Sequence, residues 1–236
     1  MAARSTFEVL QPFIAHLNSS TLLALGDNHA KPNARRLTQA LIETGTVQVL
    51  FIEWPDHNGL NAKLKELCGA EKLRGVSDAY LALTSPTPDT YFPRLKMDDA
   101  HPTIIELAAI AVSQRVRVVA CDLAPGEALD RITEMRRIEG YPHPPKESVL
   151  FDDEGMSVRD EFAVHEIGNA LKTCPAGRLM LWGDRHFQSY TGRYLKREGP
   201  NSFSVETYAD SLLIKLRAIR PETKYISFDE IEQIEL

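Results

Sequence analysis

Two histidines of the chain stand three residues after a glycine that closes an apolar run. Gly26-Asp27-Asn28-His29 follows the run Leu-Leu-Ala-Leu, and Gly183-Asp184-Arg185-His186 follows Leu-Met-Leu-Trp. Because glycine has no side chain, it lets the backbone turn sharply after a buried strand, so that the histidine points back over the strand end. Imidazole and carboxylate groups gathered there can divide acid and base roles or hold a divalent cation.

Three more ionisable residues belong to this group. Glu53 and Asp122 each follow an apolar run, while Arg159 opens a helix expected over Ser157–Lys172, next to Asp160. A cation at this position can bind a substrate carboxylate or stabilise a developing oxyanion. Structural alternatives stay open, because Glu53 could form a salt bridge with Arg159 and Asp122 could cap a turn.

The elements that must position these residues are short apolar runs, each followed by a helical pattern. The clearest runs are Thr21–Leu25, Val47–Ile52, Val116–Cys121 and Arg178–Trp182, with weaker candidates at Phe203–Tyr208 and Lys224–Phe228. Runs of this length, rich in Val, Ile and Leu, are typical of strands buried on both faces of a parallel sheet. Helices are expected at Asn33–Thr44, Thr103–Gln114 and Ser157–Lys172, the last with Ser157 as its N-cap.

This alternation of strands and helices predicts an α/β fold with a mostly parallel central sheet flanked by helices. The chain has 236 residues, a length that suits a single α/β hydrolase-like domain over 1–236. An insertion at 57–100, with helix-like sequence at Leu60–Leu83, could form a small helical cap over the sheet. The carboxyl ends of parallel strands meet at one rim, where ligands bind in such folds. We therefore expect the ionisable residues to share that rim.

Together these motifs resemble the erythromycin esterase/ChaN/Tiki-TraB superfamily, which includes a Ras/Rap1-specific endopeptidase domain of large bacterial toxins. The matching features are Gly-(acidic)-x-His after the first strand, a glutamate ending the second, Arg-Asp opening a helix, and the late Gly-x-x-His. The resemblance implies a hydrolytic site in which four residues are essential and Arg159 is a supporting cation. The four are Asp27, His29, Glu53 and His186. The family usually has Glu where this chain has Asp27, so the carboxylate here is one methylene shorter.

The resulting hypothesis is a hydrolase of an amide, peptide or ester bond. In a metal-assisted version, His29 and His186 with Glu53 or Asp27 hold a divalent Mn, Zn or Fe ion that activates water. In a metal-free version, His29 deprotonates water and Glu53 orients it. We expect a peptide or protein substrate in preference to a small ester or amide, because the cap looks too short to enclose a deep small-molecule pocket.

A non-enzymatic haem- or ligand-binding protein of the same superfamily is the alternative, with His29 or another histidine as the axial ligand. It is disfavoured because no lipoprotein signal is visible and because it leaves Glu53 and Arg159 without a task. A role as a toxin effector domain would be a biological setting for the hydrolase and not a different chemistry.

Composition narrows the other function classes. A net charge of −6 and a pI near 5.7 argue against nucleic-acid binding, which needs clustered Lys and Arg. Cys68, Cys121 and Cys174 are too few and too widely spaced for a disulfide framework. No run approaches the 18 apolar residues of a membrane span. These features predict a cytoplasmic protein, or one delivered by a specialised secretion route.

Overall fold

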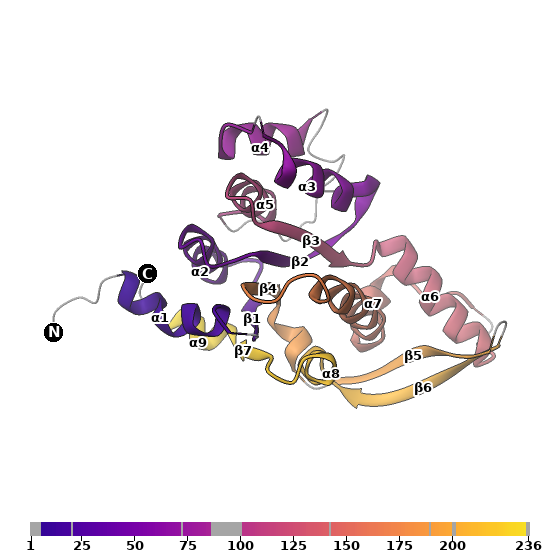
Figure 1. Cartoon of the computed structure of the whole chain (residues 1–236). Coiled ribbons are helices and arrows are strands. Elements are labelled where there is room, and N and C mark those ends of the chain that lie inside the picture. The colour runs from indigo at the N-terminus through magenta and orange to yellow at the C-terminus, as the bar shows by residue number, and fades with distance from the viewer. Residues whose placement is uncertain are drawn as a thin grey trace.

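A five-stranded parallel sheet forms the centre of the protein (Figure 1). The computed structural model describes residues 6–19, 21–71, 73–85, 101–141, 143–188, 190–199 and 202–234. The strands are β1 (Leu22–Asp27), β2 (Val49–Pro55), β3 (Arg117–Asp122), β4 (Arg178–Gly183) and β7 (Lys224–Ile226), in the order β3-β2-β4-β1-β7. Every neighbouring pair is parallel. The predicted α/β fold with a mostly parallel sheet is therefore confirmed.

The weaker strand candidates have different outcomes. Lys224–Phe228 contributes β7, which pairs with β1 at the edge of the sheet. Phe203–Tyr208 lies within β6 (Ser202–Asp210), which pairs antiparallel with β5 (Tyr190–Gly199) in a separate hairpin. This hairpin and helix α6 (Pro125–Ile138) extend together beyond the sheet (Figure 1).

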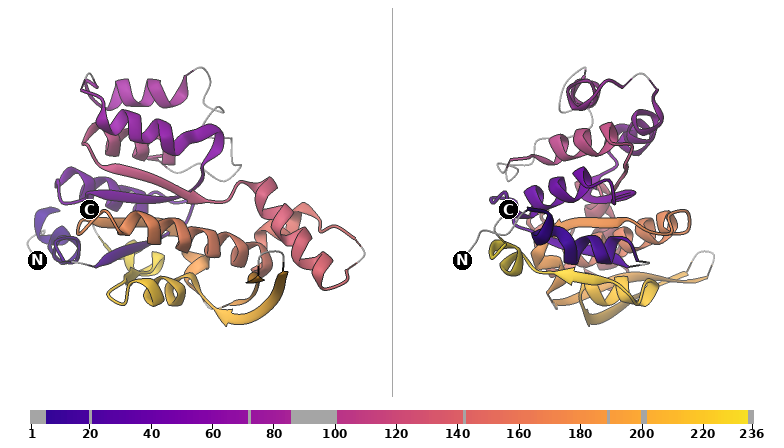
Figure 2. Two further views of the ribbon diagram at one scale, coloured as in Figure 1. Left: turned by 45° about the vertical axis from the view of Figure 1, so that its right-hand side comes forward. Right: turned by 60° about the vertical axis from the view of Figure 1, so that its left-hand side comes forward.

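Helices cover both faces of the sheet (Figure 2). One face packs against α1 (Thr6–Leu17), α2 (Asn33–Glu43), α5 (Ile104–Ser113) and α9 (Phe228–Glu232), and the other against α7 (Asp153–Leu171) and α8 (Leu212–Ile219). Within β1, Leu23 and Leu25 join the first cluster, while Leu22 and Ala24 join the second. Because alternate side chains of a strand point to opposite faces, burial on both faces requires the continuous apolar runs seen in the sequence.

The helical part of the predicted insertion lies beside edge strand β3. Helix α3 (Leu60–Gly69) packs against β3, and α4 (Val76–Thr84) packs against α5. Asn61 of α3 accepts a hydrogen bond from the Ala120 amide at 2.8 Å and donates one to the Ala120 carbonyl at 2.9 Å. This pairing satisfies backbone groups that an edge strand would otherwise expose. Positions 86–100 of the insertion lie outside the described residues.

Helix α7 begins earlier than the sequence predicted, and Ser157 is not its N-cap. The cap is Asp152, whose carboxylate accepts hydrogen bonds from the amides of Glu154 and Gly155. Gly155 also lets the chain pack closely, because a Cβ there would lie 2.4 Å from the Val149 carbonyl oxygen. Ser157 is buried inside the helix. Arg159 therefore lies in the second turn of α7 and not in the first.

None of the helices in the described ranges combines the length and the apolar character that a membrane crossing requires. Two 3₁₀ helices bear on the site described next. They are η4 (Asp184–Phe187), directly after β4, and η3 (Glu147–Phe151), which precedes α7.

Candidate active site

The order of the strands brings the predicted site residues to one rim. Strand β4 lies between β1 and β2, so the carboxyl ends of the three strands are neighbours. His29 follows β1, Glu53 lies near the end of β2, and His186 lies in η4 after β4. Between the pairs Ile52–Ala120 and Pro55–Asp122, β2 advances one residue more than β3, so Glu53 sits in a β-bulge.

Glu53 is the centre of this site. Its Oε1 accepts a hydrogen bond from Arg159 Nη2 at 2.5 Å and lies 3.4 Å from His186 Nε2. Its Oε2 accepts a hydrogen bond from the Gly183 amide at 2.6 Å and lies 3.8 Å from His29 Nε2. The two histidines therefore approach different oxygens of one carboxylate, whose side chain is 8% exposed.

The His29 ring is held from behind by Asp27. Its Nδ1 lies 2.9 Å from Asp27 Oδ2, and the same oxygen accepts hydrogen bonds from Arg35 Nε at 3.3 Å and Nη2 at 3.2 Å. Asp27 and Arg35 are both buried. Asp27 thus fixes the ring so that Nε2 faces Glu53, a positioning contact that a carboxylate commonly makes with a functional histidine.

The His186 ring is held in the same manner by Asp160. Its Nδ1 lies 2.6 Å from Asp160 Oδ1, and the Tyr190 hydroxyl donates a hydrogen bond to Asp160 Oδ2. All three residues are buried. The rim therefore carries two carboxylate–histidine pairs, each with its Nε2 directed at Glu53.

Arg159 connects Glu53 to the end of β3. Its Nε and Nη2 donate to the two oxygens of Asp122 at 2.8 and 2.6 Å, in addition to the bond with Glu53. In the part of the chain that the structure describes, its Nη1 has no hydrogen-bond partner. Arg159 thus forms the salt bridge with Glu53 that the sequence left open. Its oxyanion-binding role stays a prediction, with Nη1 as the nitrogen that would donate to a ligand.

Charge explains why the pKa values of both histidines are raised. The site holds more carboxylates than guanidinium groups; the carboxylates are Asp27, Glu53, Asp122 and Asp160, and the guanidiniums are Arg35 and Arg159. Burial alone would lower the pKa of His186, but the charges of Asp160 and Glu53 raise it to about 10. Burial likewise opposes the proton on His29, yet the Asp27 hydrogen bond and the Glu53 charge raise its pKa.

Glu53 itself stays ionised. Burial alone would raise its pKa, but the positive charges of His186 and Arg159 hold the pKa of this carboxyl well below its usual range. An ionised Glu53 keeps both histidine rings and the guanidinium turned toward it.

The donor types at the rim fit the predicted divalent cation. His29 and His186 each turn Nδ1 to a carboxylate and Nε2 to Glu53, as metal-binding histidines commonly do. Within the ranges described here, no three His, Cys, Asp or Glu side chains are already spaced as a metal centre. Glu53 instead contacts Arg159 and the Gly183 amide. The metal stays a prediction, with His29, Glu53 and His186 as the residues that would hold it.

The structure gives a different reason for the two glycines than the sequence did. Gly183 has an ordinary φ of −51°, and neither Gly26 nor Gly183 is among the described glycines with positive φ. What both require is space. A Cβ at Gly26 would lie 2.0 Å from Asp184 Oδ1, and one at Gly183 would lie 2.9 Å from Glu53 Oε2. Space for these contacts, and not a positive φ, is thus what the structure shows glycine to provide at both positions.

Replacing Gly183 by alanine should accordingly disturb the site. The new Cβ would crowd Glu53 Oε2 and lie 3.5 Å from His29 Nε2, so the carboxylate must shift. We expect activity to fall by about 10–100-fold and the free energy of unfolding by about 1–3 kcal/mol. Activity assays and urea unfolding would measure both. Gly126→Ala is the control, because its Cβ would meet open space; equal activity of the two variants would contradict this prediction.

Protein stability should decrease between pH 6.5 and pH 10. The folded-state pKa of His186, about 10, lies above its ordinary value of 6.5. Its stabilising contribution is therefore complete below pH 6.5 and disappears as the pH rises through 10, at up to about 1.4 kcal/mol per pH unit. Urea unfolding in EDTA would measure the slope. A His186→Gln variant should show a shallower slope, and an unchanged slope would refute the assignment.

Some residues at the site were not predicted. Arg35 was missed, although it shares a buried helix stripe with Thr38 and Ile42, at spacings of three and seven residues. Tyr190, whose hydroxyl donates to Asp160, was not assigned to the site from the sequence. Asp184, which follows Gly183, serves the fold: its Oδ1 accepts hydrogen bonds from the Tyr225 hydroxyl and the Phe228 amide.

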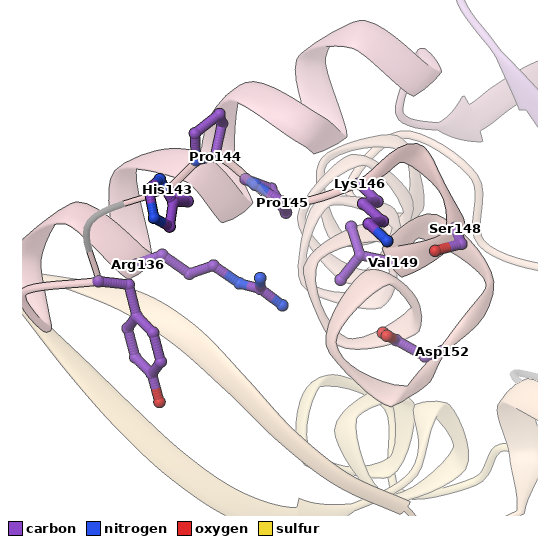
Figure 3. A pocket seen from close by; sticks show the side chains of 9 residues that line it. Arg136, His143, Pro144, Pro145, Lys146, Ser148, Val149 and Asp152 are labelled. Carbon is purple, nitrogen blue, oxygen red and sulfur yellow. The ribbon is translucent and has the colours of Figure 1, made fainter.

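A cavity of about 630 Å³ opens beside the rim and shares Asp122 with the site. It is lined by Asp56, His57, Asn58, Asp122, Ala124, Glu127, Asp130, Arg131 and Phe162. A second cavity of about 400 Å³ lies between α6 and η3, and Figure 3 shows Arg136 pointing into it. The second cavity is lined by none of the predicted site residues. The first cavity therefore reaches the site only at Asp122, the carboxylate that anchors Arg159.

Comparison of the chain with protein-family models, with curated proteins and with solved structures finds no match. The resemblance to the erythromycin esterase/ChaN/Tiki-TraB superfamily stays a prediction.

Proposed function

We propose that this protein hydrolyses an amide, peptide or ester bond at the carboxyl rim of its sheet. One observation carries the proposal: two carboxylate–histidine pairs direct their Nε2 atoms at the two oxygens of a single buried glutamate. Acid–base hydrolysis needs an oriented imidazole that water can reach, and the partly exposed His29 provides one.

His29 is the general base in this proposal. Its side chain is 35% exposed, compared with 6% for His186, so water and substrate reach its Nε2 more readily. Asp27 holds Nδ1 as the proton donor of that contact, which leaves Nε2 to accept a proton from water. The attacking oxygen then forms a bond to the substrate carbonyl carbon, and His29 returns the proton to the leaving group.

Arg159 and His186 carry the positive charge of the site. Arg159 Nη1 stabilises the negative oxygen of the tetrahedral intermediate, while its other nitrogens stay anchored on Asp122 and Glu53. His186 is buried and keeps its proton at neutral pH, because its pKa is raised to about 10. Glu53 holds His29, His186 and Arg159 around one point, because all three side chains face its carboxylate.

A divalent cation at the same residues would have to displace the proton of His186, since a histidine ligand must be neutral. Bound by His29, Glu53 and His186, it would lower the pKa of a water molecule and polarise the carbonyl group. We favour a peptide or protein over a small ester as the substrate. The superfamily resemblance supports this choice.

The test is a hydrolysis screen of the full chain. Wild type and Glu53→Gln are incubated with p-nitrophenyl esters and with a peptide library read by mass spectrometry, in EDTA and in Mn²⁺, Zn²⁺ or Fe²⁺. We expect Glu53→Gln to lose at least about 100-fold in rate. Glu166→Gln is the matched control, because Glu166 is a half-buried carboxylate of α7 that pairs with His165 and contacts none of the site residues described above. Full activity of Glu53→Gln would refute the proposal.

The haem-binding alternative has its own readout in the same preparation. A Soret band that appears on haem titration, and is lost in His29→Ala, would favour the binding protein over the hydrolase.

A further inference from the structure

We infer that Tyr190, acting through Asp160, is the positioning residue that sets the orientation of His186. The role in turnover rests on the proposed hydrolase function, whereas the hydrogen-bond chain itself can be tested without a substrate. It links the first residue of the β5–β6 hairpin to the centre of the site.

Among the described residues, each oxygen of Asp160 has one hydrogen-bond partner. Oδ1 lies 2.6 Å from His186 Nδ1, and Oδ2 accepts the hydrogen bond of the Tyr190 hydroxyl. Asp160 is fully buried, and Tyr190 is also buried, so no bulk solvent reaches the carboxylate to replace a lost partner. The rotation of the Asp160 carboxylate is therefore fixed jointly by tyrosine and histidine.

The His186 ring is in turn fixed from three directions. Asp160 holds Nδ1, Glu53 Oε1 lies 3.4 Å from Nε2, and the indole of Trp182 packs edge-on with ring centroids 6.1 Å apart. Of these contacts, only the one to Asp160 holds the ring nitrogen opposite the reacting side. A change in the Asp160 carboxylate therefore turns Nε2 relative to Glu53, which is the effect that outer hydrogen-bond partners have on functional histidines.

The chain contains a matched tyrosine that lacks this connection. The Tyr225 hydroxyl donates to Asp184 Oδ1 at 2.5 Å, so it also forms a tyrosine–aspartate hydrogen bond. Asp184 accepts a second bond from the Phe228 backbone amide and contacts no histidine among the described residues. Removing the Tyr225 hydroxyl thus changes a comparable bond outside the site.

The experiment compares Tyr190→Phe with Tyr225→Phe in the full chain. The first readout is the imidazole NMR signals of His186, assigned with His186→Gln. We expect the strongly downfield Nδ1 proton of His186 to move in Tyr190→Phe and to stay in place in Tyr225→Phe. An unmoved signal in Tyr190→Phe overturns the inference, whether or not the protein hydrolyses anything.

The second readout is kinetic and uses a substrate that the wild type cleaves. We expect kcat of Tyr190→Phe to fall by about 10–100-fold with KM unchanged, and Tyr225→Phe to keep the wild-type values. A loss confined to KM, or equal losses in the two variants, overturns the positioning role. If the wild type cleaves no substrate, the proposed function fails while the NMR comparison still decides the hydrogen-bond chain.

Discussion

Replacing His29 by alanine is expected to lower kcat/KM by about 10²–10⁴-fold on any substrate that the wild type cleaves. His29 is the more exposed histidine, and its Nε2 is directed at Glu53 while Asp27 holds Nδ1. Without the imidazole, no group in this position accepts the proton of the attacking water. The change should leave stability nearly intact, because the truncated side chain lies at the edge of the site and not in the core.

The control for this variant is His165→Ala. His165 is an exposed histidine of α7 whose side-chain contacts are Glu166 and Asn169, so its loss should not affect turnover. Initial rates and unfolding curves of both variants would be measured side by side. Retention of more than half the wild-type activity by His29→Ala would exclude it as the base. His186→Ala should also be inactive, but it should be less stable, because it leaves buried Asp160 without its main partner.

Replacing Arg35 by methionine is expected to destabilise the protein by about 3–5 kcal/mol. Arg35 and Asp27 form a hydrogen-bonded ion pair in which each side chain is 1% exposed. Methionine keeps much of the side-chain volume but leaves the Asp27 charge buried without its guanidinium. Oδ1 of Asp27 already lacks a hydrogen-bond partner within the described residues, so the carboxylate has little left to replace Arg35. Urea unfolding would give the change in free energy.

Two further variants test whether the stability loss of Arg35→Met comes from leaving a buried charge unpaired, or would follow the loss of any ion pair. Asp27→Asn combined with Arg35→Met removes both charges, so it should recover part of the lost stability. Lys31→Met breaks the exposed pair with Glu232 and should cost less than about 1 kcal/mol. A loss below about 1 kcal/mol for Arg35→Met itself would show that the pair does not hold the start of α2 to β1.

The parts of the fold that could be predicted are those with a local pattern. Four strands of the sheet appear in the sequence as apolar runs because burial on both faces leaves charged residues only near the strand ends. The partner of Phe203–Tyr208 could not be predicted in this way. Its sequence favours a strand, but pairing with Tyr190–Gly199 rather than with the central sheet depends on contacts outside the segment.

The site residues likewise fall into those with a local sequence signal and those without one. His29, Glu53 and His186 could be assigned to one rim because each follows a buried strand. Arg35 could not be assigned, because the sequence Asn-Ala-Arg-Arg is also typical of a solvent-exposed helix start. Only the structure shows that Arg35 contacts Asp27. The reason for Gly183 was also beyond the sequence, since it depends on where Glu53 places its Oε2.

The local sequence thus determines which ionisable residues are present and which strand ends carry them, through residue identity and the period of apolar residues. The contacts that turn these residues into a site join distant segments. Glu53 and the Gly183 amide are separated by 130 positions, and Glu53 and Arg159 by 106. The pairing of β4 with β2 brings Gly183 to Glu53, and the packing of α7 on the sheet brings Arg159 there. Hydrogen-bond partners, burial and pKa shifts follow from that packing, because each depends on which elements meet in space and not on their order in the chain.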